Sequence, residues 1–282
     1  KAEWEQIARQ KDVLELFAKK QKDNPLTDEA SIKIVLNAII DEEIKRFGSH
    51  PTVNISLQLQ SARERLMRFA AIQAEWAQEG WRVEGTEIPY FAKPFKDLDV
   101  SIKGFVDRVD YRVYPDGSKV FRIIDYKTWD EFESAKRKHL RTGAARQIDF
   151  AERLKLPTML ERNKNVRMLT VQLPLYGACL KSQFPERFNG SITEYDYLVF
   201  SEDKVDVLSA KAYVDLSLNT ARVAIKRIKA DIFWPARADE GGKLYDLGRL
   251  FTLSPERDFG EGDNVSGWLK KQEAKLEELK NA

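Results

Sequence analysis

The pattern of apolar and polar positions divides the chain into a helical first part and a strand-rich second part. Residues 1–80 lack strand-like alternation, and over 60–78 apolar side chains recur every three or four residues, as on one face of a helix. After Gly80 the pattern changes, and Val, Ile, Tyr and Phe become frequent in segments separated by turn residues such as those at 115–118. These segments predict an antiparallel meander of three strands, at 81–91, 100–113 and 119–126.

The second half of the chain alternates helix and strand patterns. We expect a partly buried helix over 166–181, a strand over 192–200, an amphipathic helix over 212–230 and a charged helix over 266–280. The chain accordingly divides into an N-terminal helical portion (1–80), a core that holds the strands (81–235) and a C-terminal extension with the charged helix (236–282).

Composition limits the kinds of protein this can be. With 282 residues, of which 43% are hydrophobic, the chain is large enough for a real core. Its 47 Lys and Arg nearly balance 45 Asp and Glu, so any basic surface for nucleic acid must be local. No apolar run approaches the ~20 residues of a membrane span, and the start does not resemble a signal peptide, so we expect a cytoplasmic protein without membrane contact. The first residue is Lys1, as in a fragment of a longer polypeptide or a trimmed chain.

Candidate chemistry lies at the end of the predicted hairpin, in the segment Ile-Ile-Asp-Tyr-Lys-Thr. Residues two apart on a strand share a face, so Asp125 and Lys127 project together while Tyr126 turns away. If Asp107 faces them from the neighbouring strand, the cluster can hold a divalent cation and keep an ammonium near the reacting water. A solvated strand end with an ordinary ion pair is the alternative. Arg108 and Asp110 favour a structural ion pair, and Gly104 permits close approach of backbone or substrate.

Two further motifs accompany this hairpin. Gln172 and Tyr176 are four residues apart on a predicted helix, so their amide and phenol can point together at the strand ends, although a Tyr packed in the core fits equally well. The densest basic stretch lies between hairpin and helix, where it could contact phosphates or simply form a solvated face. Its cationic residues are Lys136, Arg137, Lys138, Arg141 and Arg146.

As an ordered set, these motifs resemble the nuclease domain of RecB and AddB, within the PD-(D/E)XK nuclease superfamily. The resemblance implies an α/β (α+β) fold with a restriction-endonuclease-like core, in which helices flank a mixed central sheet beside an N-terminal helical layer. It also implies cleavage of DNA phosphodiesters with Mg²⁺ or Mn²⁺, most simply as an exonuclease in a repair or recombination system. A helicase domain or subunit, in cis or in trans, would be its partner.

The resemblance assigns roles to individual positions. Asp107, Asp125 and the backbone carbonyl of Tyr126 would be metal ligands, Lys127 the catalytic lysine, and Gln172 and Tyr176 residues that shape the site.

Two features depart from the family pattern. Where such domains commonly carry a metal-binding histidine on an early helix, this chain has Lys11, and its two histidines, His50 and His139, lie in other contexts. Glu15 or Glu87 could supply an oxygen ligand instead. With Cys179 alone, the four-cysteine iron-sulfur cluster of AddB-type domains is absent. The missing histidine leaves an alternative open: a catalytically inactive, nuclease-like module that binds DNA or a partner subunit.

Overall fold

The structure is a computed structural model, and it describes most of the first 232 residues. The described ranges are 2–45, 52–128, 140–142, 159–161, 164–168, 170–188 and 190–232, together with Phe132, Ala274, Lys275 and Glu278. The chain falls into two compact units, one formed by residues 1–144 and 158–219, the other by 145–157 and 220–282. Both sheets and the candidate site belong to the first unit.

Three helices form the predicted N-terminal layer: α1 (Ala2–Asp23), α2 (Glu29–Lys45) and α3 (Val53–Gln78). The predicted meander follows as β1 (Arg82–Ala92), β2 (Ile102–Val113) and β3 (Lys119–Thr128), with a short 3-10 helix η1 (Lys96–Leu98) between the first two strands. Both sequence predictions are confirmed, because the helical spacing before Gly80 and the β-branched and aromatic runs after it each form the expected element.

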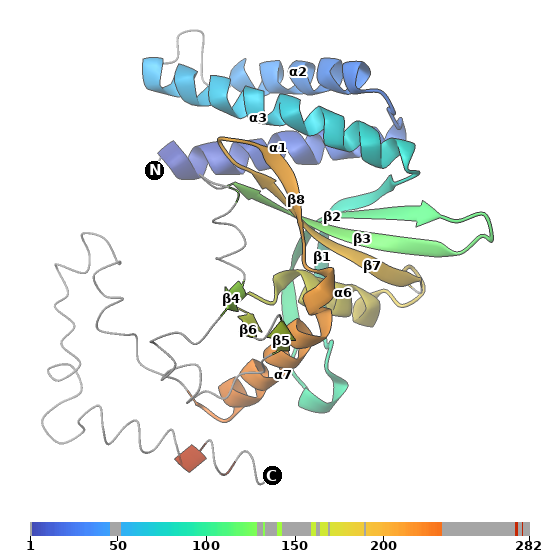
Figure 1. The fold of residues 1–282 in the computed structure, drawn as a ribbon, viewed down its shortest axis with the longest axis vertical. Coiled ribbons are helices and arrows are strands. Elements are labelled where there is room, and N and C mark those ends of the chain that lie inside the picture. The colour runs from blue at the N-terminus through green and yellow to red at the C-terminus, as the bar shows by residue number, and fades with distance from the viewer. Residues whose placement is uncertain are drawn as a thin grey trace, which may run out of the picture. The chain divides into compact units, whose positions relative to one another are not determined.

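The main sheet is mixed and has five strands in the order β1-β2-β3-β7-β8. Strand β7 (Ser191–Phe200), which matches the strand predicted at 192–200, runs parallel to β3, whereas all other neighbours are antiparallel. A parallel neighbour needs a crossover, and helix α6 (Gln172–Gln183) lies on that connection. Strand β8 (Val205–Ser209), which the sequence did not predict, closes the far edge (Figure 1).

Helices cover both faces of this sheet (Figure 1). Along β3, Val120 and Ile124 pack into a core with α1–α3, and Phe121 and Ile123 pack into a second core with α6, as the two-residue period of a strand requires. The observed architecture is therefore a mixed five-stranded sheet between helical layers, which confirms the restriction-endonuclease-like α/β fold class. None of the helices that the structure describes is both long enough and apolar enough to cross a bilayer.

The prediction of a helix over 166–181 is wrong in its first part. Val166 and Met168 belong to β6 (Lys164–Met168), the central strand of a small sheet, and α6 begins only at Gln172. The two side chains lie two apart and share an apolar cluster with Tyr213 and Leu216, so their period is that of a strand. The flanking strands are β4 (Leu140–Thr142) and β5 (Met159–Glu161).

The amphipathic helix predicted over 212–230 is present as a 3-10 turn, η2 (Lys211–Tyr213), followed by α7 (Val214–Lys229). Of the helix predicted over 266–280, only Ala274, Lys275 and Glu278 lie among the described residues. The boundaries expected after residues 80 and 235, between the N-terminal portion, the core and the C-terminal extension, stay predictions.

A buried ionic cluster fixes β2 to β3. Arg108 donates to both carboxylate oxygens of Asp110, at 2.7 and 3.0 Å, and Arg122 on β3 donates to the same carboxylate at 3.0 Å. The three side chains are almost fully buried, and the Arg122 guanidinium lies 3.8 Å from the ring centroid of Trp76. This confirms the structural role predicted for Arg108 and Asp110.

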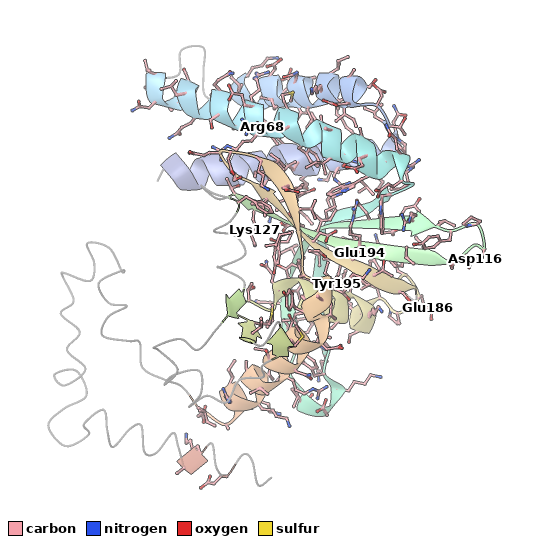
Figure 2. The ribbon with its side chains drawn as sticks, in the orientation of Figure 1. Arg68, Asp116, Lys127, Glu186, Glu194 and Tyr195 are labelled. Atoms are coloured by element: carbon pink, nitrogen blue, oxygen red, sulfur yellow. The ribbon has the colours of Figure 1, made fainter. Side chains whose placement is uncertain are left out.

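The opposite ends of the β2–β3 hairpin have different chemistry, as Figure 2 shows for Asp116 and Lys127. At the turn, the Asp116 carboxylate accepts hydrogen bonds from the Ser118 backbone N–H at 2.9 Å and hydroxyl at 2.6 Å. These bonds fix the turn locally. The other end of the hairpin, where the two strands separate, carries the predicted catalytic residues.

Candidate active site

Two carboxylates lie side by side where β2 and β3 end their pairing. The last paired residues are Arg108 and Ile124, so Asp107 and Asp125 occupy the next position on each strand. Both are buried, with relative exposures of 4% and 1%. The Tyr126 backbone N–H donates a hydrogen bond to Asp107 Oδ2 at 3.0 Å, while the Tyr126 ring packs with Phe200 in the core under α1–α3. The predicted alternation along this strand is thus observed.

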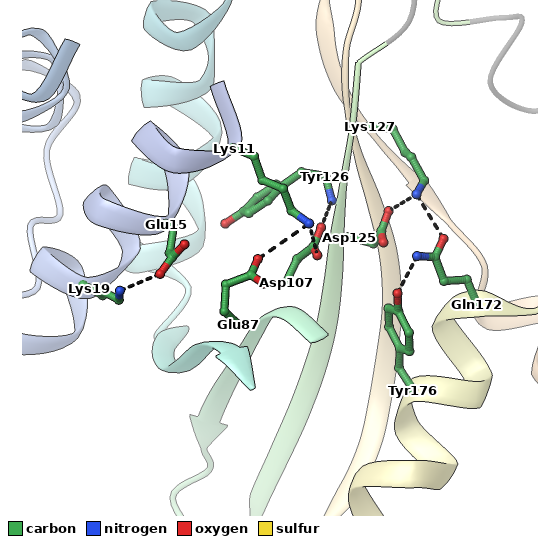
Figure 3. A network of polar contacts seen from close by, with 10 residues as sticks. All are labelled: Lys11, Glu15, Lys19, Glu87, Asp107, Asp125, Tyr126, Lys127, Gln172 and Tyr176. Carbon is green, nitrogen blue, oxygen red and sulfur yellow. Dashed lines mark hydrogen bonds and ion pairs between the residues drawn. The ribbon is translucent and has the colours of Figure 1, made fainter. Parts of the chain in front are cut away.

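Lys127 joins the strand end to helix α6. Its Nζ lies 2.5 Å from Asp125 Oδ2 and donates a hydrogen bond to Gln172 Oε1 at 3.0 Å, and the Gln172 amide donates to the Tyr176 hydroxyl at 2.5 Å (Figure 3). The contact with Asp125 is an ion pair without the directional geometry of a hydrogen bond, so Asp125 Oδ2 has no donor aimed at it. Gln172 and Tyr176 therefore share a helix face that points at the carboxylates, as their spacing predicts.

Helix α6 can come this close because of Gly177. A Cβ at that position would lie 3.0 Å from the ring of Tyr195 on β7, so a larger residue there would press against this tyrosine. The absence of a side chain at Gly177 thus sets the distance at which Gln172 meets Lys127.

Burial dominates the electrostatics of Asp125. The pKa of this carboxyl is raised to about 6, chiefly because burial removes it from water; Lys127 opposes the shift, and the negative charge of Asp107 adds to it. Ionising a buried carboxyl next to a second carboxylate costs free energy, and a cation bound between the two would reduce that free-energy cost.

Lys11 is the second ammonium of the site. From α1, its Nζ lies 2.6 Å from Asp107 Oδ1 and 3.6 Å from Glu87 Oε1 (Figure 3). Burial favours a lower pKa for Lys11, but the hydrogen bond and charge of Asp107 outweigh it and raise the pKa above its ordinary value. Lys11, which stands in the place of the expected histidine, therefore lies at the carboxylates and brings a positive charge to them.

Glu87 reaches the site through an unusual backbone. It lies on β1 between residues that pair with Arg108 and Val106, and its φ of +44° is in the left-handed region that non-glycine residues rarely adopt. Burial raises the pKa of Glu87, and the charges of Asp107 and Glu15 add to this shift. Glu15 itself pairs with Lys19 at 2.5 Å. Nothing in the local sequence predicts this conformation.

Tyr90 is a site residue that the sequence analysis missed. It faces Gly104 across β1 and β2, and a Cβ on Gly104 would lie 2.5 Å from the Tyr90 hydroxyl. The ring then packs on Tyr176, with centroids 5.8 Å apart. The close approach predicted at Gly104 is therefore made by Tyr90, and a glycine opposite an aromatic residue in a predicted hairpin was the available signal.

The basic stretch lies almost wholly outside the described residues. This holds for Lys136, Arg137, Lys138 and Arg146, and the structure describes only the backbone of Arg141, in β4. His50 and His139 also lie outside the described ranges.

The donor set fits one hydrated divalent cation better than a cage made of protein ligands. Among the residues that the structure describes, no three His, Cys, Asp or Glu side chains converge closely enough to hold a metal ion. Mg²⁺, however, is usually held by one or two carboxylates with water and substrate phosphate completing its coordination. Asp107 and Asp125 supply such a pair, and Asp125 Oδ2 is a buried oxygen that is ion-paired with Lys127 and, among the described residues, accepts no well-formed hydrogen bond.

Comparison with known proteins agrees with this geometry. No curated protein sequence matches the chain. The family model of the PD-(D/E)XK nuclease superfamily matches residues 12–233, which begins beside Lys11 and includes the sheet, Asp107, Asp125 and helix α6. Nucleases of this superfamily generally use divalent metal ions such as Mg²⁺. With a match over well more than half of its length, the chain belongs to the PD-(D/E)XK nuclease superfamily.

Proposed function

We propose that the chain is a metal-dependent deoxyribonuclease domain of RecB/AddB type that hydrolyses DNA phosphodiesters. Exonuclease action within a repair or recombination system, beside a helicase domain or subunit, follows from the same resemblance. One observation carries the proposal: a strand end where two buried carboxylates meet a lysine that is held at 2.5 Å from Asp125 and 3.0 Å from Gln172.

Each residue has a distinct task in this proposal. Asp107, Asp125 and the backbone carbonyl of Tyr126 would hold Mg²⁺ or Mn²⁺. Such a cation lowers the pKa of bound water and polarises the scissile phosphate. The Lys127 ammonium has three N–H donors, and its ion pair with Asp125 and its hydrogen bond to Gln172 hold it at the carboxylates, so a remaining N–H can meet the attacking water or a phosphate oxygen. There it orients the nucleophile and offsets negative charge in the transition state.

Gln172 and Tyr176 position that lysine. The Gln172 carbonyl accepts from Lys127, and because its amide in turn donates to Tyr176, the side chain is held at both ends. Burial raises the pKa of Tyr176 to about 12, so the phenol keeps its proton well above neutral pH, while its oxygen accepts the hydrogen bond from Gln172.

A second candidate function is a nuclease-like module that binds DNA or a partner subunit without cutting. The ammonium of Lys11 favours it, because it contacts Asp107 Oδ1, one of the oxygens that the cation would need.

Cleavage and metal binding together separate the two candidates. Purified protein is incubated with linear and circular DNA, with and without Mg²⁺ or Mn²⁺, and cleavage of linear DNA alone indicates an exonuclease. We expect Asp107→Asn and Asp125→Asn to abolish cleavage and weaken Mn²⁺ binding in calorimetry, because each removes a charged oxygen. The control is Asp99→Asn, an exposed aspartate whose φ of +46° suits asparagine. Undiminished Mn²⁺ affinity in either variant would remove that residue from the proposed ligands.

Lys127→Ala tests the catalytic lysine separately. It removes no oxygen ligand, so Mn²⁺ binding should persist while single-turnover cleavage falls by ~10² to 10⁴ at saturating Mg²⁺. Lys33→Ala, at an exposed ion pair on α2, is the control. A wild-type protein that never cuts would favour the non-cutting module.

A further inference from the structure

A basic pocket of about 310 Å³ lies beside β1, the edge strand of the main sheet. Lys19 and Lys22 of α1 line it on one side and Arg187 of the α6–β7 connection on another, with Gly85 and Thr86 of β1 between them. Gly85 leaves room there, because a Cβ would lie 3.2 Å from the Arg187 guanidinium. The pocket is thus a recess at the edge strand that is lined by three cations.

Positive charge exceeds negative charge around this pocket. Arg187 and Lys119 share the Glu84 carboxylate, at 2.8 and 2.9 Å, and although burial disfavours its charged form, the two cations hold the pKa of Glu84 below its ordinary value. Lys19 pairs with Glu15. Lys22 forms no ion pair with a carboxylate of the described residues, and it donates to the Glu84 backbone carbonyl at 2.8 Å. The pocket lining therefore holds three cations and no carboxylate, although Glu15 and Glu84 pair with two of these cations, and this balance favours an anionic ligand.

Helix α1 connects the pocket to the nuclease centre. Lys11, Glu15, Lys19 and Lys22 follow one another at intervals of three or four residues, so they share one face of the helix. Figure 3 shows Lys11 at Glu87 and Asp107 and, further along the helix, Lys19 paired with Glu15. At 1.5 Å per residue, Lys19 and Lys22 lie roughly 12 and 16 Å along the axis from Lys11. A stacked nucleic-acid strand covers that distance in about four nucleotides, at roughly 3.4 Å each.

We propose that this pocket binds a backbone phosphate of the DNA strand on which the nuclease centre acts, about four nucleotides from the scissile bond. The assignment rests on the proposed function. Ammonium and guanidinium groups match phosphate oxygens, and the Thr86 hydroxyl can add a neutral donor, so recognition is of the backbone and independent of base sequence.

The test measures binding in EDTA, where no cleavage occurs. The full chain is titrated against a fluorescent single-stranded 12-mer at several salt concentrations, and Lys19→Gln/Lys22→Gln is compared with Lys33→Gln/Lys45→Gln, which changes two lysines in surface pairs on α2. We expect the pocket variant to bind about tenfold more weakly at low salt. Its log–log salt slope should be shallower by about 0.7, since each phosphate contact on a single strand contributes roughly that amount.

A second variant tests the pocket without removing its lysines, in case the double variant fails to fold. Thr86→Glu leaves both lysines in place and adds a carboxylate to the pocket, so it should also weaken binding, with an unchanged thermal melt. If both pocket variants bind the 12-mer with the same affinity and salt slope as the control Lys33→Gln/Lys45→Gln, the proposal is wrong.

Free phosphate distinguishes a DNA subsite from a small-anion site. If inorganic phosphate alone binds wild type tightly and the double variant does not, while DNA binding is equal in the two, the pocket serves a small anion and the proposal is wrong. Cleavage is assayed separately, so a wild type that does not cut would refute the nuclease function without deciding what the pocket binds.

Discussion

Replacing Lys11 by methionine should tighten binding of Mn²⁺ to the candidate nuclease centre. Lys11 Nζ lies 2.6 Å from Asp107 Oδ1, and a bound cation would lie about 2.0–2.6 Å from a ligating carboxylate oxygen. The ammonium and a cation on that oxygen would therefore be at most about 5 Å apart, and the two like charges repel. Methionine removes the charge and keeps an unbranched side chain of similar length.

The size of the effect follows from Coulomb's law. Charges of +1 and +2 separated by about 5 Å repel by roughly 1.7 kcal/mol at the dielectric constant of water, and physiological salt reduces this to about 1 kcal/mol. Lys11 is 41% exposed, so the high dielectric constant is the appropriate one. A gain of about 1–2 kcal/mol corresponds to Mn²⁺ affinity about five- to thirtyfold higher.

Isothermal titration of Mn²⁺ into wild type, Lys11→Met and the control Lys33→Met measures this directly. Lys11→His should bind more tightly still, since imidazole adds a ligand where the ammonium was. If Lys11→Met binds Mn²⁺ as weakly as wild type or more weakly, the ammonium does not compete with the metal. In that case, its role is to hold Asp107 in place.

Three further predictions concern stability. The folded-state pKa of Asp125 is about 6, above its ordinary 3.8, so the ionised carboxylate lowers the stability of the fold above pH 6 and has no such effect below pH 3.8. In EDTA, Asp125→Asn should therefore have a higher melting temperature than wild type at pH 8, and the difference should shrink as pH falls towards 4. Asp110→Asn leaves two buried arginines without their carboxylate and should cost about 3–5 kcal/mol in urea unfolding, against less than about 1 for the exposed Asp41→Asn. Gly104→Ala should cost about 1–3 kcal/mol, and clearly less when Tyr90→Leu removes the clash; equal costs in both backgrounds would refute this contact.

Local patterns were sufficient to predict most of the fold. The helical spacing of the first 80 residues and the β-branched runs after Gly80 predict α1–α3 and β1–β3, since each element buries a face that its own sequence period defines. The prediction failed at Val166 and Met168, because two apolar residues on either side of one polar residue fit a short strand as well as the start of a helix. Strand β8 was missed for a different reason: its five residues are only partly buried or exposed, so they form no clear apolar run.

The candidate site was predictable where it depends on period and topology. Asp125 and Lys127 share a face because they are two apart on one strand, and Gln172 and Tyr176 because they are four apart on one helix. The position of Lys11 beside Asp107 depends on how α1 packs across β1, which no local pattern encodes. The left-handed backbone of Glu87 is likewise a tertiary effect, since a strand pattern predicts extended φ there.

The charges around the two aspartates connect the predictions of metal binding and stability. Asp107 and Asp125 each have an ammonium on one side, Lys11 and Lys127, and Glu87 adds a third carboxylate near Lys11. Burial still raises the pKa of both Asp125 and Glu87, so the two lysines do not satisfy these acids fully. A site that remains short of positive charge is less stable without a cation and gains affinity for one, as expected of a functional site that is built at a cost in stability. If Asp125→Asn stabilised the fold at pH 8 and also weakened Mn²⁺ binding, both effects would have the same origin in this shortage of positive charge.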